Sequence, residues 1–102
     1  MVSASRAKRD ATSNQLLSDL SANLFELEAA RRTERLTTDS LLPQAELTFK
    51  AALSGYETGK VDFATLLDAQ RQIRQAKLNQ IKSRAEAQVR LAEIERILGE
   101  EL

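Results

Sequence analysis

Tyr56-Glu57-Thr58-Gly59-Lys60-Val61-Asp62-Phe63 is the stretch that decides the fold, because it lies between two long runs of helix-forming residues. The glycine at position 59 can adopt the positive φ that ends a helix. Asp62 can accept hydrogen bonds from the free N–H groups that begin another helix. The sequence therefore predicts a helix that ends near residue 57, a turn over residues 58–62 and a second helix from about residue 62.

The rest of the chain offers few other places to turn. Its 102 residues include three glycines and one proline, and Ala, Leu, Gln, Glu, Arg and Lys predominate. These residues are strong helix formers, whereas the β-branched and aromatic residues typical of strands are sparse. We therefore expect an all-α fold, a single unit made of one long antiparallel two-helix coiled-coil hairpin.

Apolar residues upstream of the turn recur at helical spacing in two blocks. The first block is Leu17, Leu20, Leu24 and Leu27. After a polar stretch the second block follows in a shifted phase, as Leu42, Ala45, Phe49, Ala52 and Tyr56. Together the blocks predict a first helix over about residues 5–57, longer than the second.

Pro43 lies inside this predicted helix. An internal proline removes a backbone hydrogen bond and clashes with the preceding turn, so it kinks or ends a helix. Ser40 could act as an N-cap, which would divide the segment into helices of about 5–38 and 41–57 and give a compact three-helix bundle. No Gly, Asn or second Pro stands nearby to reverse the chain. We therefore favour one long helix kinked at Pro43.

The second helix is predicted from about residue 62 to Leu98, with Gly99 in the C-cap region. It carries two adjacent stripes at helical spacing. The first stripe is Leu66, Ala69, Ile73, Ala76, Gln80, Ser83, Ala87, Arg90, Ile94 and Ile97. The second stripe is Leu67, Arg74, Leu78, Ile81, Ala85, Val89 and Ala92. Two stripes give a wider apolar surface than one partner helix needs, so we expect each helix to touch more than one other helix.

The two helices differ in length. At 1.5 Å per residue, the first would be roughly 75–80 Å long and the second about 55 Å. Residues before about Leu20 would then have no partner within the hairpin. We expect the chain to be a fragment of a larger protein.

Composition excludes several classes of function. The fifteen basic and fifteen acidic residues cancel, which argues against a nucleic-acid partner. The chain has no cysteine or histidine, so disulfides, thiolate or imidazole metal sites and Cys or Ser-His nucleophiles are absent. No carboxylate pair marks a catalytic pocket, and we expect no enzyme activity, cofactor or metal site. No apolar run approaches the roughly 20 residues of a membrane span, and residues 1–15 lack the apolar core of an export signal.

The turn carries more apolar side chains than a connector needs. Tyr56, Val61 and Phe63 crowd a hairpin end that should be solvated, which indicates a docking surface. A plain helix–helix connector is the alternative interpretation. Asp68 follows on the second helix, where an isolated aspartate is usually a solvated surface residue. Three cations, Arg71, Arg74 and Lys77, are close enough in sequence to pair with it.

The motifs around the turn resemble the TolC-type outer membrane efflux channel family. They are Leu41-Leu42-Pro43-Gln44-Ala45, Tyr56-x-x-Gly59, Leu66-Leu67-Asp68-Ala69-Gln70 and a closing Leu98-Gly99. Repeats of that family read approximately LLPxA, Y-x-x-G, V/L-L-D/N-A-Q and L-x-x-x-L-G. The order and the spacings agree over roughly residues 16–99. The GKVDF and LLDAQR versions of these motifs are similar to the cation-efflux branch that works with heavy-metal pumps.

The resemblance implies a periplasmic α-helical hairpin of an outer membrane protein. In the family, three identical chains, each with two similar hairpins, form a twelve-helix tunnel. Such a homotrimer would account for two apolar stripes on one helix. The implied function is passive transport through an aqueous duct, without catalysis.

The resemblance also implies roles for the turn. Hairpin tips of the family meet the helical hairpins of a periplasmic adaptor protein, which completes a conduit from an inner membrane pump. By position, the contact would be made by Thr58, Gly59, Lys60, Val61, Asp62 and Phe63. Asp68 stands where some members place an acidic ring that constricts the closed entrance, and Tyr56 where an aromatic helps to hold it shut. Other members of the family can carry a second acid at the position of Thr65 and an arginine at the position of Val61, which complete a polar network that holds the entrance closed. This chain has neither.

A structural or signalling coiled-coil hairpin, such as the hairpin of an adaptor protein, is the alternative function. Such a hairpin needs one apolar stripe. The second stripe, and the order of the motifs around the turn, favour the channel.

Overall fold

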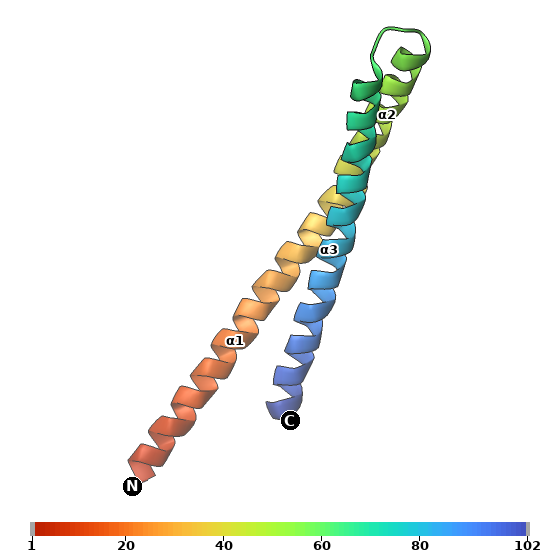
Figure 1. Cartoon of the computed structure of the whole chain (residues 1–102). Coiled ribbons are helices and arrows are strands. Elements are labelled where there is room, and N and C mark those ends of the chain that lie inside the picture. The colour runs from red at the N-terminus through yellow and green to blue at the C-terminus, as the bar shows by residue number, and fades with distance from the viewer. Residues whose placement is uncertain (1, 102) are drawn as a thin grey trace.

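The computed structural model describes residues 2–101, with side chains from residue 3 to residue 100. These residues form one antiparallel hairpin, 83 Å long and 19 × 15 Å across (Figure 1). The first arm consists of α1 (Val2–Leu36), a π-helical turn η1 (Thr37–Leu41) and α2 (Leu42–Glu57). The second arm is α3 (Phe63–Glu101). The predicted all-α hairpin with a longer first arm is confirmed.

The first arm passes Pro43 without a break. Leu41 and Leu42 keep helical backbone angles, and the N–H of Leu42 donates to the carbonyl of Thr37, five residues back. This wider turn accommodates a proline that has no N–H and would crowd the turn before it. The three-helix alternative is wrong, because Ser40 lies inside η1 and accepts a hydrogen bond from Gln44 Nε2 at 3.2 Å instead of capping a helix.

The turn η1 also resets the phase of the first arm. The seam, the line of contact with α3, includes Leu20 and Leu27 of α1 and Thr37, the first residue of η1. The next seam residue is Ala45, eight positions after Thr37 where a regular heptad repeat would need seven. The π-turn holds the extra residue, so Ala45 and Ala52 remain buried against α3.

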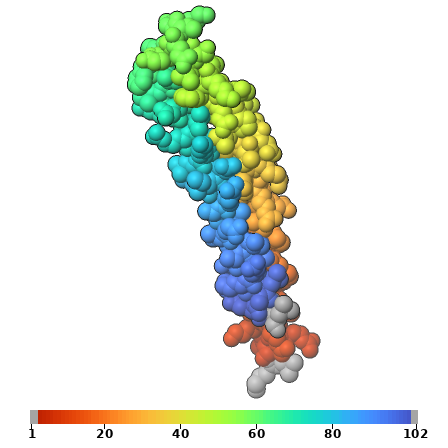
Figure 2. Space-filling view, turned by 90° about the vertical axis from the view of Figure 1, so that its right-hand side faces the viewer, coloured from red at the N-terminus to blue at the C-terminus, as the bar shows by residue number. Residues whose placement is uncertain are grey.

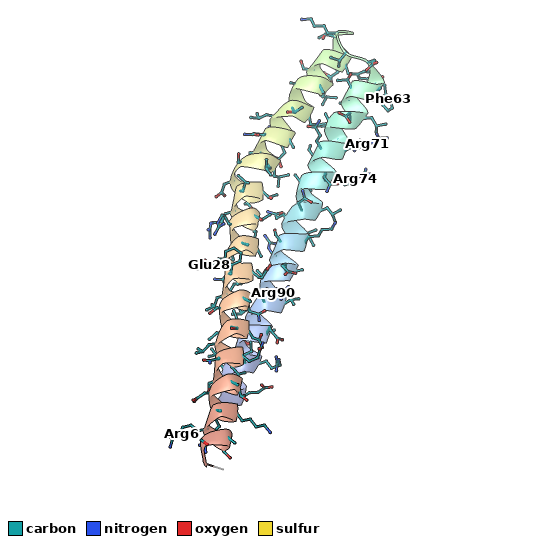
Figure 3. All side chains as sticks on the ribbon, turned by 90° about the vertical axis from the view of Figure 1, so that its left-hand side faces the viewer. Arg6, Glu28, Phe63, Arg71, Arg74 and Arg90 are labelled. Atoms are coloured by element: carbon teal, nitrogen blue, oxygen red, sulfur yellow. The ribbon has the colours of Figure 1, made fainter. Side chains whose placement is uncertain are left out.

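Only half of the first predicted apolar block lies in the core. Leu20 and Leu27 pack into the core, but Leu17 and Leu24 are exposed. Asn23 takes the seam position between Leu20 and Leu27, because its amide bonds the Asp19 carbonyl at 2.8 Å and Arg90 Nη1 at 3.2 Å. Arg90 reaches it from α3, between the arms (Figure 3). A hydrogen-bonded polar pair therefore occupies a place where the pattern alone predicts a leucine.

The two stripes of α3 differ in burial. Every residue of the first stripe is buried or half-buried, so this stripe is the seam. The second stripe is largely open: Leu78, Ile81 and Val89 are all exposed. The expected contact of each helix with more than one other helix stays a prediction.

The seam is built mainly from small side chains. Six alanines are buried along it, namely Ala30, Ala45, Ala52, Ala69, Ala76 and Ala87. Small side chains let the helix axes approach closely, so backbone atoms replace bulky groups as packing partners. The base of the hairpin carries a larger apolar cluster of Leu27, Ala30, Ala87 and Ile94, with Leu20 and Leu91 at its edge. Most of the apolar burial therefore lies in the base half.

The ends of the arms differ from the predicted bounds. The first arm begins at Val2 and not near residue 5, and α3 continues through Gly99 to Glu101. Gly99 is therefore a helical residue and not the predicted C-cap. Residues 3–15 are exposed throughout, and α1 extends beyond the end of α3 (Figure 2). Among the described helices, none has a stretch both long and apolar enough to cross a membrane.

Candidate docking site at the hairpin tip

Backbone hydrogen bonds end α2 in a Schellman motif. The Lys60 N–H donates to the Gly55 carbonyl at 2.7 Å, and the Gly59 N–H donates to the Tyr56 carbonyl at 3.1 Å. This pair of bonds requires a left-handed residue after the helix. Gly59 provides it with a φ of 76°. The predicted role of Gly59 is confirmed, and the motif satisfies carbonyls that the helix end would otherwise leave free.

Asp62 caps α3, as predicted. Its Oδ1 accepts the backbone N–H of Thr65 at 2.9 Å and the hydroxyl of the same residue at 2.8 Å. The backbone N–H of Thr65, followed by its hydroxyl, lowers the pKa of the Asp62 carboxyl. Thr65 is a capping partner that the sequence analysis missed. Its position three residues after an N-cap is the signal that could have identified it.

The cap predicts a specific loss of stability in acid. A carboxyl whose pKa is lowered by folding contributes stability above its unfolded pKa, and this contribution is lost as the pH falls through the folded value. At pH values below about 4, we expect the free energy of unfolding of the chain to decrease. Asp62→Asn keeps a hydrogen-bond acceptor but cannot titrate, so its free energy of unfolding should decrease less. Thermal unfolding followed by circular dichroism at pH 7 and pH 3 measures both.

Asp68→Asn is the matched control, since Asp68 caps no helix. Equal acid-induced losses in the parent chain and Asp62→Asn would contradict the assigned role of the cap.

Gly55 is a second tip residue that the sequence analysis missed. A Cβ built on it would lie 3.1 Å from both methyl carbons of Val61. The N–H of Val61 also donates to the Gly55 carbonyl at 3.1 Å. The side chain of Val61 therefore folds back onto the last turn of α2 and is half-buried. Val61 belongs in part to the packing of the tip itself, and any larger residue at position 55 would push its side chain outward by a few tenths of an ångström.

The outer surface of the tip is aromatic and polar. The rings of Tyr56 and Phe63 meet edge to face with centroids 6.0 Å apart, and they are residues of opposite arms. Tyr56 is 44% exposed and Phe63 60% exposed. We call the exposed residues of this end the tip surface; they are Tyr56, Glu57, Thr58, Gly59, Lys60, Asp62 and Phe63. The structure thus brings together all the predicted docking residues, with Val61 partly withdrawn beneath them.

Asp68 lies apart from the tip surface, one and a half turns into α3. It is exposed and accepts a hydrogen bond from Gln72 Nε2 at 3.4 Å. The suggested pairing with Arg71, Arg74 or Lys77 is not formed, since no described ion pair includes Asp68. Arg71 and Arg74 lie on the side of α3 that faces away from α2 (Figure 3). The carboxylate of Asp68 is therefore free to face a neighbouring molecule.

No group of three or more His, Cys, Asp or Glu side chains gathers closely enough to hold a metal ion among the described residues. The tip surface presents two aromatic rings, the Lys60 ammonium and the carboxylates of Glu57 and Asp62, on a turn closed by the Schellman motif and the Asp62 cap.

Comparison with known proteins identifies the family. A family model described as outer membrane efflux protein matches residues 1–100. The chain is 34% identical over 74 residues to the cobalt-zinc-cadmium resistance protein CzcC of Cupriavidus metallidurans. That match covers 72% of this chain and 18% of the relative, so the chain spans less than a fifth of that protein's length. No solved structure is significantly similar to the chain. Because the family model covers nearly all of its residues, the chain belongs to the outer membrane efflux protein family.

Proposed function

We propose that the chain is a periplasmic wall segment of a trimeric outer membrane efflux channel, and that its tip docks a periplasmic adaptor protein. The match of the efflux family model to residues 1–100 is the observation that carries this proposal. The same match argues against an adaptor or signalling hairpin. In this function the chain conducts solute passively and catalyses no reaction.

The exposed apolar residues support a place in a wall of helices. Leu78, Ile81 and Val89 follow one another along an open side of α3, and Leu36 and Leu47 are exposed on the first arm. Apolar side chains in such numbers are costly on a free hairpin, because water contacts them over most of its length. Neighbouring hairpins of the trimer would cover them on both sides.

The tip surface supports docking to a helical partner. It is the end of the molecule farthest from both chain termini (Figure 1), so a partner can approach along the hairpin axis. The exposed edges of Tyr56 and Phe63 offer apolar contact area, and Lys60 offers a cation. The adaptor would in turn connect the channel to an inner membrane pump and complete a tripartite assembly.

Tyr56 and Asp68 are the proposed gate residues. Both are exposed, and they lie on opposite arms near the tip. Three copies of Asp68 around an axis would form an acidic constriction, and three copies of Tyr56 an apolar one. Thr65 cannot extend this constriction freely, because its hydroxyl already donates to Asp62.

The exported substrate is proposed to be a heavy-metal cation. The named relative is a cobalt-zinc-cadmium resistance protein, and the match covers 72% of this chain and 18% of that protein. Selection of the cation would occur in the pump, with the channel serving as the exit duct.

The docking proposal is tested by crosslinking from the tip. The chain has no cysteine, so Lys60→Cys introduces a single reactive thiol on the tip surface. We expect it to crosslink to the adaptor in the assembled pump. The matched control is Gln88→Cys, an exposed position far along α3, which should give no adaptor crosslink. Equal crosslinking from both positions, or none from Lys60→Cys in an assembled pump, would refute tip docking.

A further inference from the structure

The seam is polar where it passes the π-turn. Thr37 is completely buried there, and Ser83 stands buried on the α3 side. Gln80 Nε2 donates to Thr38 Oγ1 across the arms at 2.7 Å, and Arg84 pairs with Glu34 at 2.9 Å. Apolar packing resumes on either side, in the base cluster and in the alanines of the tip half. The π-turn therefore separates two apolar blocks.

The packing at this point is also incomplete. The hydroxyl of Thr37 has no hydrogen-bond partner, although it is fully buried. A groove of about 470 Å³ lies beside it, lined among others by Thr37, Leu41 and Ser83. A buried polar group without a partner costs free energy, and the open groove leaves neighbouring side chains room to move. Apart from the two polar contacts across the arms, the seam at η1 therefore lacks the close apolar packing found on either side.

The backbone is adapted to bend at the same place. The N–H of Leu42 reaches back to Thr37 because η1 contains one residue more than an α-helix would. Pro43 contributes no N–H to the helix, so the arm has one hydrogen bond fewer to lose when it bends. The second arm has no such interruption, since α3 runs from Phe63 to Glu101 as one α-helix. Bending of the hairpin would therefore concentrate in the first arm.

We propose that η1 and Pro43 form a hinge at which the tip half of the hairpin swings relative to the base half. Hinges are short segments that absorb a change in backbone angles between two packed bodies, and π-turns within helices are frequent at functional sites. The two bodies are the base cluster and the alanine-packed tip half. The inference rests on the proposed function, in which the swing moves Tyr56 and Asp68 between closed and open arrangements.

The hinge can be removed without changing the seam. Deletion of Ser40 combined with Pro43→Ala takes out the extra residue, and Thr37 and Ala45 then stand one heptad apart in an unbroken α-helix. Pro43→Ala alone keeps the extra residue and serves as the matched control. In the full-length channel we expect amide exchange of the π-turn segment to be roughly tenfold slower after the deletion, because regular i to i−4 hydrogen bonds replace the wider turn.

Efflux in the assembled pump, together with the Lys60→Cys adaptor crosslink, completes the test. The hinge predicts that the deletion variant keeps the crosslink but loses efflux. Pro43→Ala keeps the extra residue of η1 and should keep the crosslink and most of the efflux. Efflux by the deletion variant would overturn the hinge, as would loss of efflux in both variants. Loss of the crosslink in the deletion variant would also overturn it, because the defect would then lie in docking. Failure of tip docking is recognised separately, because the Lys60→Cys channel with an unchanged π-turn would then give no adaptor crosslink.

Discussion

Truncation of Ile94 to alanine is expected to lower the free energy of unfolding of this 102-residue chain by about 2–4 kcal/mol. Ile94 is 7% exposed and belongs to the base cluster with Leu27 and Ala87. Its removal loses the transfer free energy of the buried methyl groups and leaves a cavity that a rigid seam fills poorly. Urea unfolding followed by far-UV circular dichroism measures the change.

Ile81 provides the matched control, because it is the same residue on the same helix but is 61% exposed. Ile81→Ala should change the stability of the single hairpin by no more than about 0.5 kcal/mol. Comparable losses from both variants would mean that the second stripe is buried in solution by self-association. In the assembled channel, by contrast, the proposed function expects Ile81→Ala to weaken the trimer.

Replacement of Gly59 by alanine is expected to destabilise the hairpin by about 1–2 kcal/mol, because a Cβ is unfavourable at a left-handed residue. The φ of Gly59 is 76°, and no atom lies within 4 Å of the position that a Cβ would take. The cost is therefore conformational and not steric. Thermal and urea unfolding of the variant measure it, and tip crosslinking to the adaptor should weaken in parallel.

Gly99→Ala should have the opposite sign. Gly99 lies inside α3, also with open space around the Cβ position. Alanine in a helix is favoured over glycine by up to about 1 kcal/mol. Destabilisation by Gly99→Ala would indicate that Gly99 ends the helix in solution, as the sequence pattern suggested. A neutral Gly59→Ala would contradict the Schellman motif at the tip.

The tip was predictable because its hydrogen bonds are local. Gly59 and Asp62 satisfy groups within a few residues of themselves, so their roles depend little on the rest of the fold. The role of Gly55 was not predicted, because the preference for glycine at this position comes from the side chain of Val61, which folds back over it. A close approach between side chain and backbone leaves no periodic signal in a sequence.

The seam of the first arm was only partly predictable. The first apolar block suggested Leu17 and Leu24 as core residues, yet both are exposed. The partner helix decides which face is buried, and Asn23 is accepted there because its amide bonds both the Asp19 carbonyl and Arg90 of α3. Periodicity identifies an apolar face to within about one residue, which on a helix corresponds to a rotation of roughly 100°.

The sequence by itself determined the all-α class, the reversal at Gly59 and Asp62 and the family, whereas it favoured but did not decide the continuity of the first arm past Pro43. These follow from residue propensity, local capping and ordered motifs, which act over short stretches of chain. Only the tertiary structure decided which stripe of α3 forms the seam and where the extra residue of the first arm is held. Both depend on how two helices fit side by side, because the π-turn at Thr37–Leu41 holds the one residue that would otherwise turn Ala45 and Ala52 away from α3.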